Sequence, residues 1–125
     1  GNRASMWHRE GTYDAIAERL LTGLTYDRLL LEYDTERAGS FEPLRFVPKG
    51  VTIVLGLITT KSGRVESVDE LCRRIDDAAR FVPLEQLALS PQCGFASGIA
   101  GNLLSEGEQW AKIDVMHETA RQVWK

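Results

Sequence analysis

Two side chains able to bind a metal ion follow or lie within apolar stretches of this chain. Cys93 comes two residues after Pro91, which closes the apolar stretch 87–90. Proline donates no hydrogen bond to a strand ladder and restricts the residue before it, so the chain is expected to leave a sheet there. Cys93 is therefore predicted to lie at the end of a strand, where catalytic and ligand groups gather in parallel α/β folds.

Glu32 lies inside an apolar run, with three leucines before it and Tyr33 after it. Burying a carboxylate costs free energy unless the group is ion-paired or bound to a metal. A salt bridge with Arg37 or Arg45 and a metal-ligand role both satisfy that requirement. For Cys93 the residues alone favour the simpler interpretation, because a free cysteine usually behaves as a small apolar residue.

The remaining cysteine and the two histidines have ordinary interpretations. Cys72 falls inside an amphipathic pattern and is predicted to pack in a helix, while His117 is expected on or near the surface of the last helix. His8 lies in a polar N-terminal stretch from which it could reach a site. The glycine-rich stretch 94–102 lacks the lysine and spacing of a P-loop, so it predicts a flexible active-site loop.

Apolar periodicity predicts the elements that position these groups. The expected elements are strands at 28–33, 51–58 and 87–90, covered on both faces, and helices at 13–22, 67–81 and 105–124. Such alternation is typical of a parallel sheet. The carboxyl ends of parallel strands open on one face, so the polar groups at the three strand ends are expected to converge although they are far apart in sequence. These groups are Glu32, Asp34, Glu36 and Arg37 at the first strand, Thr59, Thr60 and Lys61 at the second, and Cys93 at the third.

The expected helices carry recognisable end signals. Thr12 is predicted as the first N-cap with Gly23 as the stop, and capping boxes are predicted at Ser67 with Glu70 and at Ser105 with Glu108. The inner face of the last helix is predicted to consist of Trp110, Ile113, Met116, Ala120 and Val123.

Three strands are too few for a self-sufficient parallel sheet, because two apolar edges would stay unpaired. The fold class is therefore predicted as α/β, the C-terminal part of a TIM (β/α)8 barrel, with residues 1–125 forming one partial domain. The chain opens on Gly1 with no methionine before Met6, which suggests a piece of a longer protein. Such a piece is expected to associate with itself or with the missing barrel segment.

Composition excludes several classes of partner. The formal net charge of −3 gives no reason to expect binding to nucleic acid or to an anionic membrane. The longest apolar run, 51–58, is too short to cross a bilayer. The two cysteines do not form a disulfide framework, so a reducing, cytoplasmic location is expected.

Three stretches together resemble the C-terminal barrel of the cobalamin-independent methionine synthase family, especially its shorter, single-barrel bacterial members. They are LLLEYDTERAGSFEPLRFVPKG (29–50), VLGLITTKSGRVES (54–67) and LSPQCGFAS (89–97). The resemblance implies a TIM barrel with one zinc ion at the carboxyl ends of its strands. In that family the ligands are a His-x-Cys motif, a glutamate on the next strand and a cysteine after the last strand.

Matched position by position, the glutamate of that family falls on Glu32 and the last cysteine on Cys93. Family members read His-x-Cys-Arg-Gly-Asn, and this chain begins at the Gly-Asn, so two ligands and most homocysteine and folate contacts would lie upstream. Lys61 stands where the longer synthases have a histidine. The resemblance implies no catalytic residue that this chain can be said to carry.

The implied activity is zinc-dependent methyl transfer to homocysteine from 5-methyltetrahydropteroyltriglutamate, in methionine biosynthesis. A thiol with a pKa of about 8.5 is a poor nucleophile at neutral pH, and zinc makes its thiolate available. Two alternatives stay open: a zinc-dependent thiol alkyltransferase of the epoxide–coenzyme M type, and a non-catalytic association unit. With two of four ligands, the chain alone is expected to be metal-free or partly loaded, and inactive.

Overall fold

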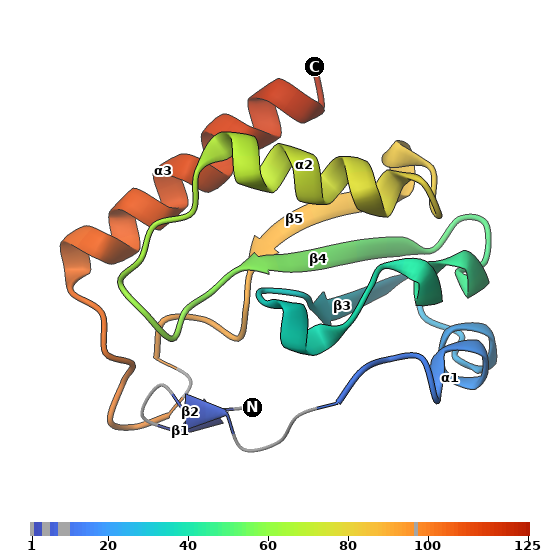
Figure 1. The fold of residues 1–125 in the computed structure, drawn as a ribbon, viewed down its shortest axis with the longest axis horizontal. Coiled ribbons are helices and arrows are strands. Elements are labelled where there is room, and N and C mark those ends of the chain that lie inside the picture. Colours follow the sequence, from blue (N-terminus) through green and yellow to red (C-terminus); the bar gives the residue numbers. More distant parts are fainter. Residues whose placement is uncertain (1, 4–5, 8–10, 97) are drawn as a thin grey trace.

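A computed structural model describes residues 2–3, 6–7, 11–96 and 98–125; His8 lies outside them. The strands and helices, in chain order, are β1 (Asn2–Arg3), β2 (Met6–Trp7), α1 (Ala17–Gly23), β3 (Arg28–Glu32), β4 (Thr52–Ile58), α2 (Val68–Ala79), β5 (Leu87–Pro91) and α3 (Glu106–Val123). Figure 1 shows the strands β3, β4 and β5 converging on one end, with α2 and α3 lying along them. The strand–helix alternation predicted from the sequence is confirmed.

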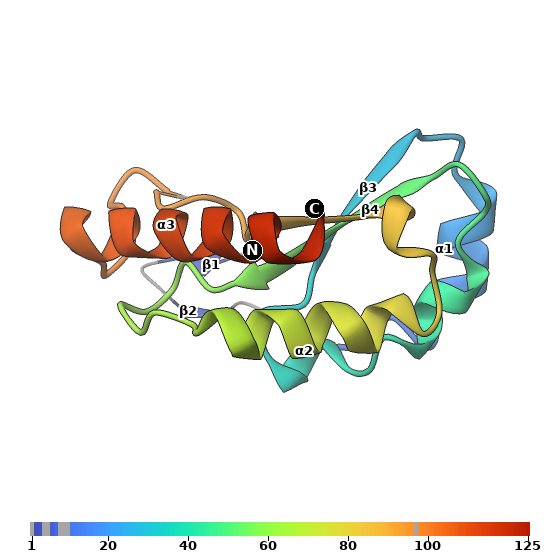
Figure 2. The same cartoon turned by 90° about the horizontal axis from the view of Figure 1, so that it is seen from above.

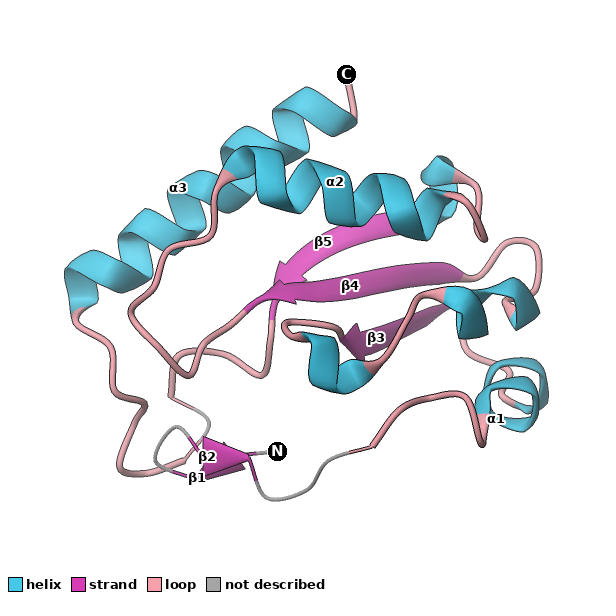
Figure 3. Ribbon diagram, viewed as in Figure 1, coloured by secondary structure: helices cyan, strands magenta, loops and turns pink. Residues whose placement is uncertain are grey.

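The main sheet is parallel, with β4 between β3 and β5 (Figure 3). Its register pairs Glu32 with Gly56 and Gly56 with Ser90, so the carboxyl ends of all three strands lie at one edge. The short strands β1 and β2 form a separate antiparallel pair, which the sequence analysis did not predict. The register thus places Glu32, at the end of β3, and Cys93, just after β5, at the same end of the sheet although they are 61 positions apart in sequence.

One face of the sheet is covered, and that face holds the core. Ile53 and Leu55 of β4 are fully buried and belong to one cluster with Leu71 and Ile75 of α2. Helices α2 and α3 run side by side over this face, and α3 also contacts β5 (Figures 1 and 2). The expectation of strands covered on both faces was wrong for β3, where Leu30 is 73% exposed, because successive side chains alternate between faces.

Helix α1 is shorter than predicted. It begins at Ala17, with Ile16 and not Thr12 at the N-cap position, and no side chain caps it. The preceding residues are drawn toward the sheet because the Tyr13 hydroxyl accepts a hydrogen bond from the Glu32 N–H at 3.1 Å. This tertiary contact outweighs the helix-start signal at Thr12.

The two capping boxes have different outcomes. At α3 the box is complete, since Ser105 and Glu108 bond to each other's backbone N–H. At α2 the Ser67 side chain accepts from the Glu70 N–H, but the Glu70 carboxylate pairs with Arg64 at 2.7 Å. The capping box at Ser67 is therefore only half formed, because Arg64 is a stronger partner for the Glu70 carboxylate.

The predicted inner face of α3 is correct in part, since Met116 and Val123 pack against the core, but it was wrong for Trp110. Trp110 is half-exposed, while Lys112 and Thr119 are fully buried, with Val115 and Met116 packed against the core. Lys112 is drawn inward because its ammonium donates to Glu66 Oε2 at 2.9 Å and to the Arg64 carbonyl. The remaining Glu66 oxygen accepts from the Thr59 N–H at 2.9 Å. None of the helices in the described part of the chain has the length and apolar character needed to cross a bilayer.

The Glu66–Lys112 pair generates a stability prediction. Lys112→Met leaves Glu66 buried without its countercharge, so the free energy of unfolding should fall by about 3–5 kcal/mol. Chemical denaturation of the 125-residue chain measures this loss. Adding Glu66→Gln to Lys112→Met should restore part of it, because no charge is then left unpaired.

The matched control is Arg121→Met, which breaks the exposed Arg121–Glu118 pair of the same helix. That loss should stay below about 1 kcal/mol. An equal effect of the Lys112 and Arg121 substitutions would contradict the structural role of the buried pair.

Candidate metal centre at the carboxyl edge of the sheet

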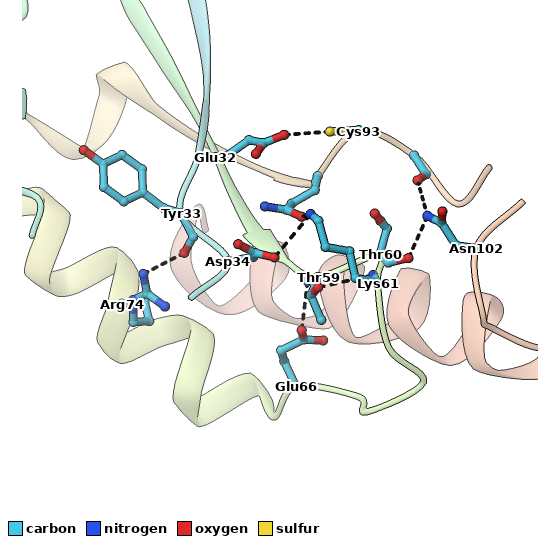
Figure 4. Close-up of polar contacts among 12 residues, drawn as sticks. Glu32, Tyr33, Asp34, Thr59, Thr60, Lys61, Glu66, Arg74, Cys93 and Asn102 are labelled. Carbon is cyan, nitrogen blue, oxygen red and sulfur yellow. Dashed lines mark hydrogen bonds and ion pairs between the residues drawn. The ribbon is translucent and has the colours of Figure 1, made fainter. Parts of the chain in front are cut away.

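Glu32 and Cys93, the two candidate ligands, lie against each other. Glu32 is the last residue of β3, and Cys93 follows β5 by two residues. The Cys93 thiol donates a hydrogen bond to Glu32 Oε1 at an Sγ–O distance of 2.6 Å (Figure 4). Arg45, one of the two arginines considered as a partner of Glu32, pairs with Glu42 instead.

Gly56 makes this approach possible. It lies on β4 between Glu32 and Ser90, and a Cβ there would stand 3.2 Å from the Leu31 carbonyl oxygen and 3.7 Å from the Cα atoms of Glu32 and Gln92. At position 56, a side chain larger than a methyl group would come against the backbone at the ends of both β3 and β5. The sequence marks Gly56 only as a glycine within a β-branched strand, a pattern that often indicates close approach of another group.

A small cavity opens beside the thiol and the carboxylate. Its volume is about 150 Å³, and its lining is mostly apolar. The lining residues are Leu30, Leu31, Glu32, Val54, Gly56, Ser90, Pro91, Gln92 and Cys93. These residues come from all three strands, so the cavity belongs to the carboxyl edge of the sheet and not to a single loop.

The backbone of Glu32 is fixed by an aromatic pair that the sequence analysis missed. Besides accepting from the Glu32 N–H, Tyr13 packs on Tyr33 with ring centroids 5.2 Å apart. Burial raises the pKa of the Tyr13 hydroxyl above its usual value, which keeps the group neutral. Arg74 of α2 donates to the Tyr33 carbonyl at 2.7 Å and so holds the chain directly after Glu32.

The Cys93 thiol is held in its protonated form. Partial burial raises its pKa, as do the hydrogen bond to Glu32 and the negative charge of that carboxylate. The Lys61 ammonium acts in the opposite direction and lowers the pKa by a smaller amount. A cation bound by both groups would reverse this balance, because a metal deprotonates a coordinating thiol.

Lys61 reaches this edge from the segment after β4, as predicted. Its side chain is buried, with the Asp34 carboxylate at 3.7 Å and the Gln92 Oε1 within hydrogen-bond distance (Figure 4). Asn102, from the glycine-rich loop, donates to the Thr60 carbonyl at 2.8 Å and to the Gly94 carbonyl at 3.3 Å. The sequence analysis expected Asp34 at this face but gave no role to Gln92 or Asn102.

The other candidate groups do not join this pair. His117 is exposed on α3, and Cys72 is half-buried in α2, where burial and the acidic residues Asp76 and Asp69 raise its pKa. Both cysteines are free thiols. Within the part of the chain that the structure describes, no three His, Cys, Asp or Glu side chains come close enough to hold a metal ion together. The described residues therefore offer two ligands, one sulfur and one carboxylate oxygen.

A thiol and a carboxylate paired at the carboxyl ends of parallel strands give the layout of α/β folds whose functional sites lie at strand ends. Comparison with known proteins specifies the family. A family model described as "Cobalamin-independent synthase, Catalytic domain" matches residues 13–121. The chain belongs to this family of methyltransferase enzymes, which confirms the resemblance found in the sequence.

Individual relatives agree with this assignment. The chain is 56% identical to YxjH and 53% identical to YxjG of Bacillus subtilis (strain 168). Each match covers all of this chain but only 33% of the relative's length. A candidate vitamin-B12-independent methionine synthase structure from Listeria monocytogenes matches with a TM-score of 0.69 and 37% identity, over 88% of this chain and 31% of that one.

A B12-independent methionine synthase from Shewanella sp. W3-18-1, solved with selenomethionine, matches over 89% of this chain and 30% of that one. Its TM-score is 0.72 and its identity 21%, so it supports the fold. The three parallel strands and their helices are thus those of a B12-independent methionine synthase fold.

The contact between thiol and carboxylate predicts a pH shift. Glu32→Gln removes the negative charge next to Cys93, which should lower the pKa of the thiol and move the midpoint of its alkylation to lower pH. The measurement is the rate of iodoacetamide modification of the metal-free chain between pH 7 and about 10, with peptide mass spectrometry separating Cys93 from Cys72. Glu42→Gln, an exposed carboxylate paired with Arg45, is the matched control. A midpoint that stays in place or rises in Glu32→Gln would refute the contact.

Proposed function

We propose that the chain supplies the last third of a zinc-binding TIM barrel that transfers a methyl group to the thiol of homocysteine. The donor in this proposal is 5-methyltetrahydropteroyltriglutamate and the product is methionine. The observation that carries the proposal is the meeting of Cys93 and Glu32 at 2.6 Å, at the strand ends of a chain that belongs to the cobalamin-independent synthase family.

The two side chains fit a zinc site. Zinc in proteins takes cysteine sulfur, histidine nitrogen and carboxylate oxygen, and Cys93 with Glu32 offers a sulfur and an oxygen on one face. In the proposal these two residues hold the ion together with the upstream His-x-Cys motif. Zinc, when bound, lowers the pKa of a substrate thiol so that the thiolate can attack the methyl carbon at neutral pH.

The residues of this chain hold the ion and orient its ligands in that reaction. Cys93 and Glu32 would hold the ion, and the Cys93 thiol would have to lose the proton that it now donates to Glu32. Tyr13 holds the Glu32 backbone, and Leu30 and Val54 supply apolar surface beside the reacting sulfur, which the rest of the barrel would have to cover to exclude water. We place the reaction in the cytoplasm, where thiols remain reduced, because both cysteines are free.

Zinc content tests the site assignment. The chain alone should bind zinc weakly, because two ligands do not complete a tetrahedral shell. Co-expression with the N-terminal two-thirds of YxjH, the 56% identical relative, supplies the upstream motif and should give about one zinc per complex. Cys93→Ser in that complex should abolish tight zinc binding, and Glu32→Gln should weaken it about 10- to 100-fold. Atomic absorption after gel filtration measures both.

Cys72→Ser is the matched control, since Cys72 is the other free thiol, and it should leave zinc content unchanged. Retention of one zinc by a folded Cys93→Ser complex would refute the assignment of Cys93. The loaded complex is then assayed with homocysteine and the folate donor, and in parallel with coenzyme M and an epoxide. Turnover with coenzyme M and the epoxide, but not with homocysteine and the folate donor, would favour the alkyltransferase alternative over methyl transfer.

Association is the second part of the proposal. Strands β3 and β5 are the edges of the three-stranded sheet, and Leu30 on the uncovered face is largely exposed. Unpaired edges and exposed apolar residues favour pairing with other chains. The chain alone should therefore form dimers or larger species in light scattering at high micromolar concentration, and addition of the N-terminal part of YxjH should replace them by a 1:1 complex. A stable monomer at that concentration would contradict this expectation.

A further inference from the structure

The loop that carries Cys93 is tied to the segment after β4 on both sides of the cysteine. Before Cys93, the Gln92 N–H donates to the Ile58 carbonyl at 3.0 Å, and the Gln92 side chain accepts from the Lys61 ammonium. After Cys93, the Gly94 carbonyl accepts from Asn102, which also donates to the Thr60 carbonyl. Both neighbours of Cys93 thus bond to the segment 58–61 or to a side chain fixed on it.

Lys61 also reaches the segment that carries Glu32. Its ammonium lies 3.7 Å from Asp34 Oδ2, two residues after Glu32, and both side chains are almost fully buried. The same ammonium therefore joins the loop after β3 to the loop after β5. Because an ammonium only donates hydrogen bonds, it also fixes which end of the Gln92 amide faces it. A buried side chain held in this way has few other positions available.

We propose that Lys61 and Asn102 are positioning residues that hold the Cys93 thiol against Glu32. They act through Gln92 and Gly94, the two residues on either side of Cys93. The consequence for metal binding rests on the proposed zinc site; the consequence for the thiol–carboxylate contact does not. Groups that orient metal ligands typically change metal affinity 10- to 100-fold when removed.

The test compares Lys61→Met, Lys61→Arg and Asn102→Ala in the 125-residue chain, with Lys49→Met, an exposed lysine, as the control. The first readout is the rate of Cys93 alkylation by iodoacetamide at pH 8 in the metal-free chain, relative to Cys72 in the same molecules. Release of Cys93 from Glu32 should raise this ratio at least threefold in Lys61→Met and Asn102→Ala. Lys61→Arg keeps the charge and the donors, so its ratio should stay closer to that of the unmodified chain.

The direction of the change separates this role from two others. If Lys61 acted only through its charge, its loss would slow alkylation, since the ammonium favours the thiolate. If both residues were merely structural, the ratio would not change in variants that keep the circular dichroism spectrum of the original chain. A slower or unchanged rate in folded Lys61→Met and Asn102→Ala would overturn the proposal. Should Lys61→Met unfold because Asp34 loses its countercharge, Lys61→Met with Asp34→Asn takes its place.

The second readout is Co²⁺ titration, followed by the thiolate-to-cobalt charge-transfer absorption, in the complex with the N-terminal part of YxjH. Lys61→Met and Asn102→Ala should weaken Co²⁺ binding about tenfold, with partial rescue by Lys61→Arg. Affinities within twofold of the original complex would overturn the positioning role at the metal. Absence of the absorption band in the original complex would count against the proposed zinc site alone, and the alkylation ratio would then decide the positioning role.

Discussion

The buried ion pair between Glu66 and Lys112 is the interaction on which the arrangement of the strand ends depends. Glu66 uses one carboxylate oxygen for the Lys112 ammonium and the other for the Thr59 N–H, so the chain leaving β4 is fixed to α3. A buried ion pair is held in one geometry, because moving either side chain away would leave the other charge buried and unpaired. Lys61 lies two residues after Thr59, so this anchor also fixes the position of Lys61. The contacts of Lys61 with Asp34 and Gln92 then hold the loops that carry those two residues.

Parallel register and a missing side chain then bring the two candidate ligands together. Pairing of Glu32 with Gly56, and of Gly56 with Ser90, sets β3 and β5 on either side of a residue that has no Cβ. The side chain of Glu32 can therefore reach across the end of β4 to Cys93. A Cβ at position 56 would lie 3.2 Å from the Leu31 carbonyl oxygen and 3.7 Å from the Cα atoms of Glu32 and Gln92, so glycine allows the closest approach of the two strand ends.

The sequence predicts those parts of this structure that depend on local pattern. Apolar runs predicted all three parallel strands, and Ser105 with Glu108 predicted a complete capping box, because these signals lie within a few residues of each other. It failed where a distant partner decided the outcome. Tyr13 leaves the predicted helix to bind Glu32, and Lys112, a charged residue, lies inside while Trp110 lies half outside. The strand ends predicted that Glu32 and Cys93 converge, and the family resemblance predicted their role as metal ligands, whereas the contacts of Gln92 and Asn102 have no local signal.

Charge explains why such a site needs the whole set of contacts. Glu32 and Asp34 bring two carboxylates to one strand end, and Lys61 brings a single ammonium, so an additional thiolate at Cys93 is unfavourable until a cation arrives. The protonated thiol donates to Glu32, and its pKa is raised by partial burial first, then by this hydrogen bond and the charge of the carboxylate. At the proposed zinc site, metal binding would have to release the thiol proton, so affinity for the metal should increase with pH. The hydrogen bond between Cys93 and Glu32 thus keeps the two candidate ligands together, and its proton is the one that a cation at the proposed site would displace.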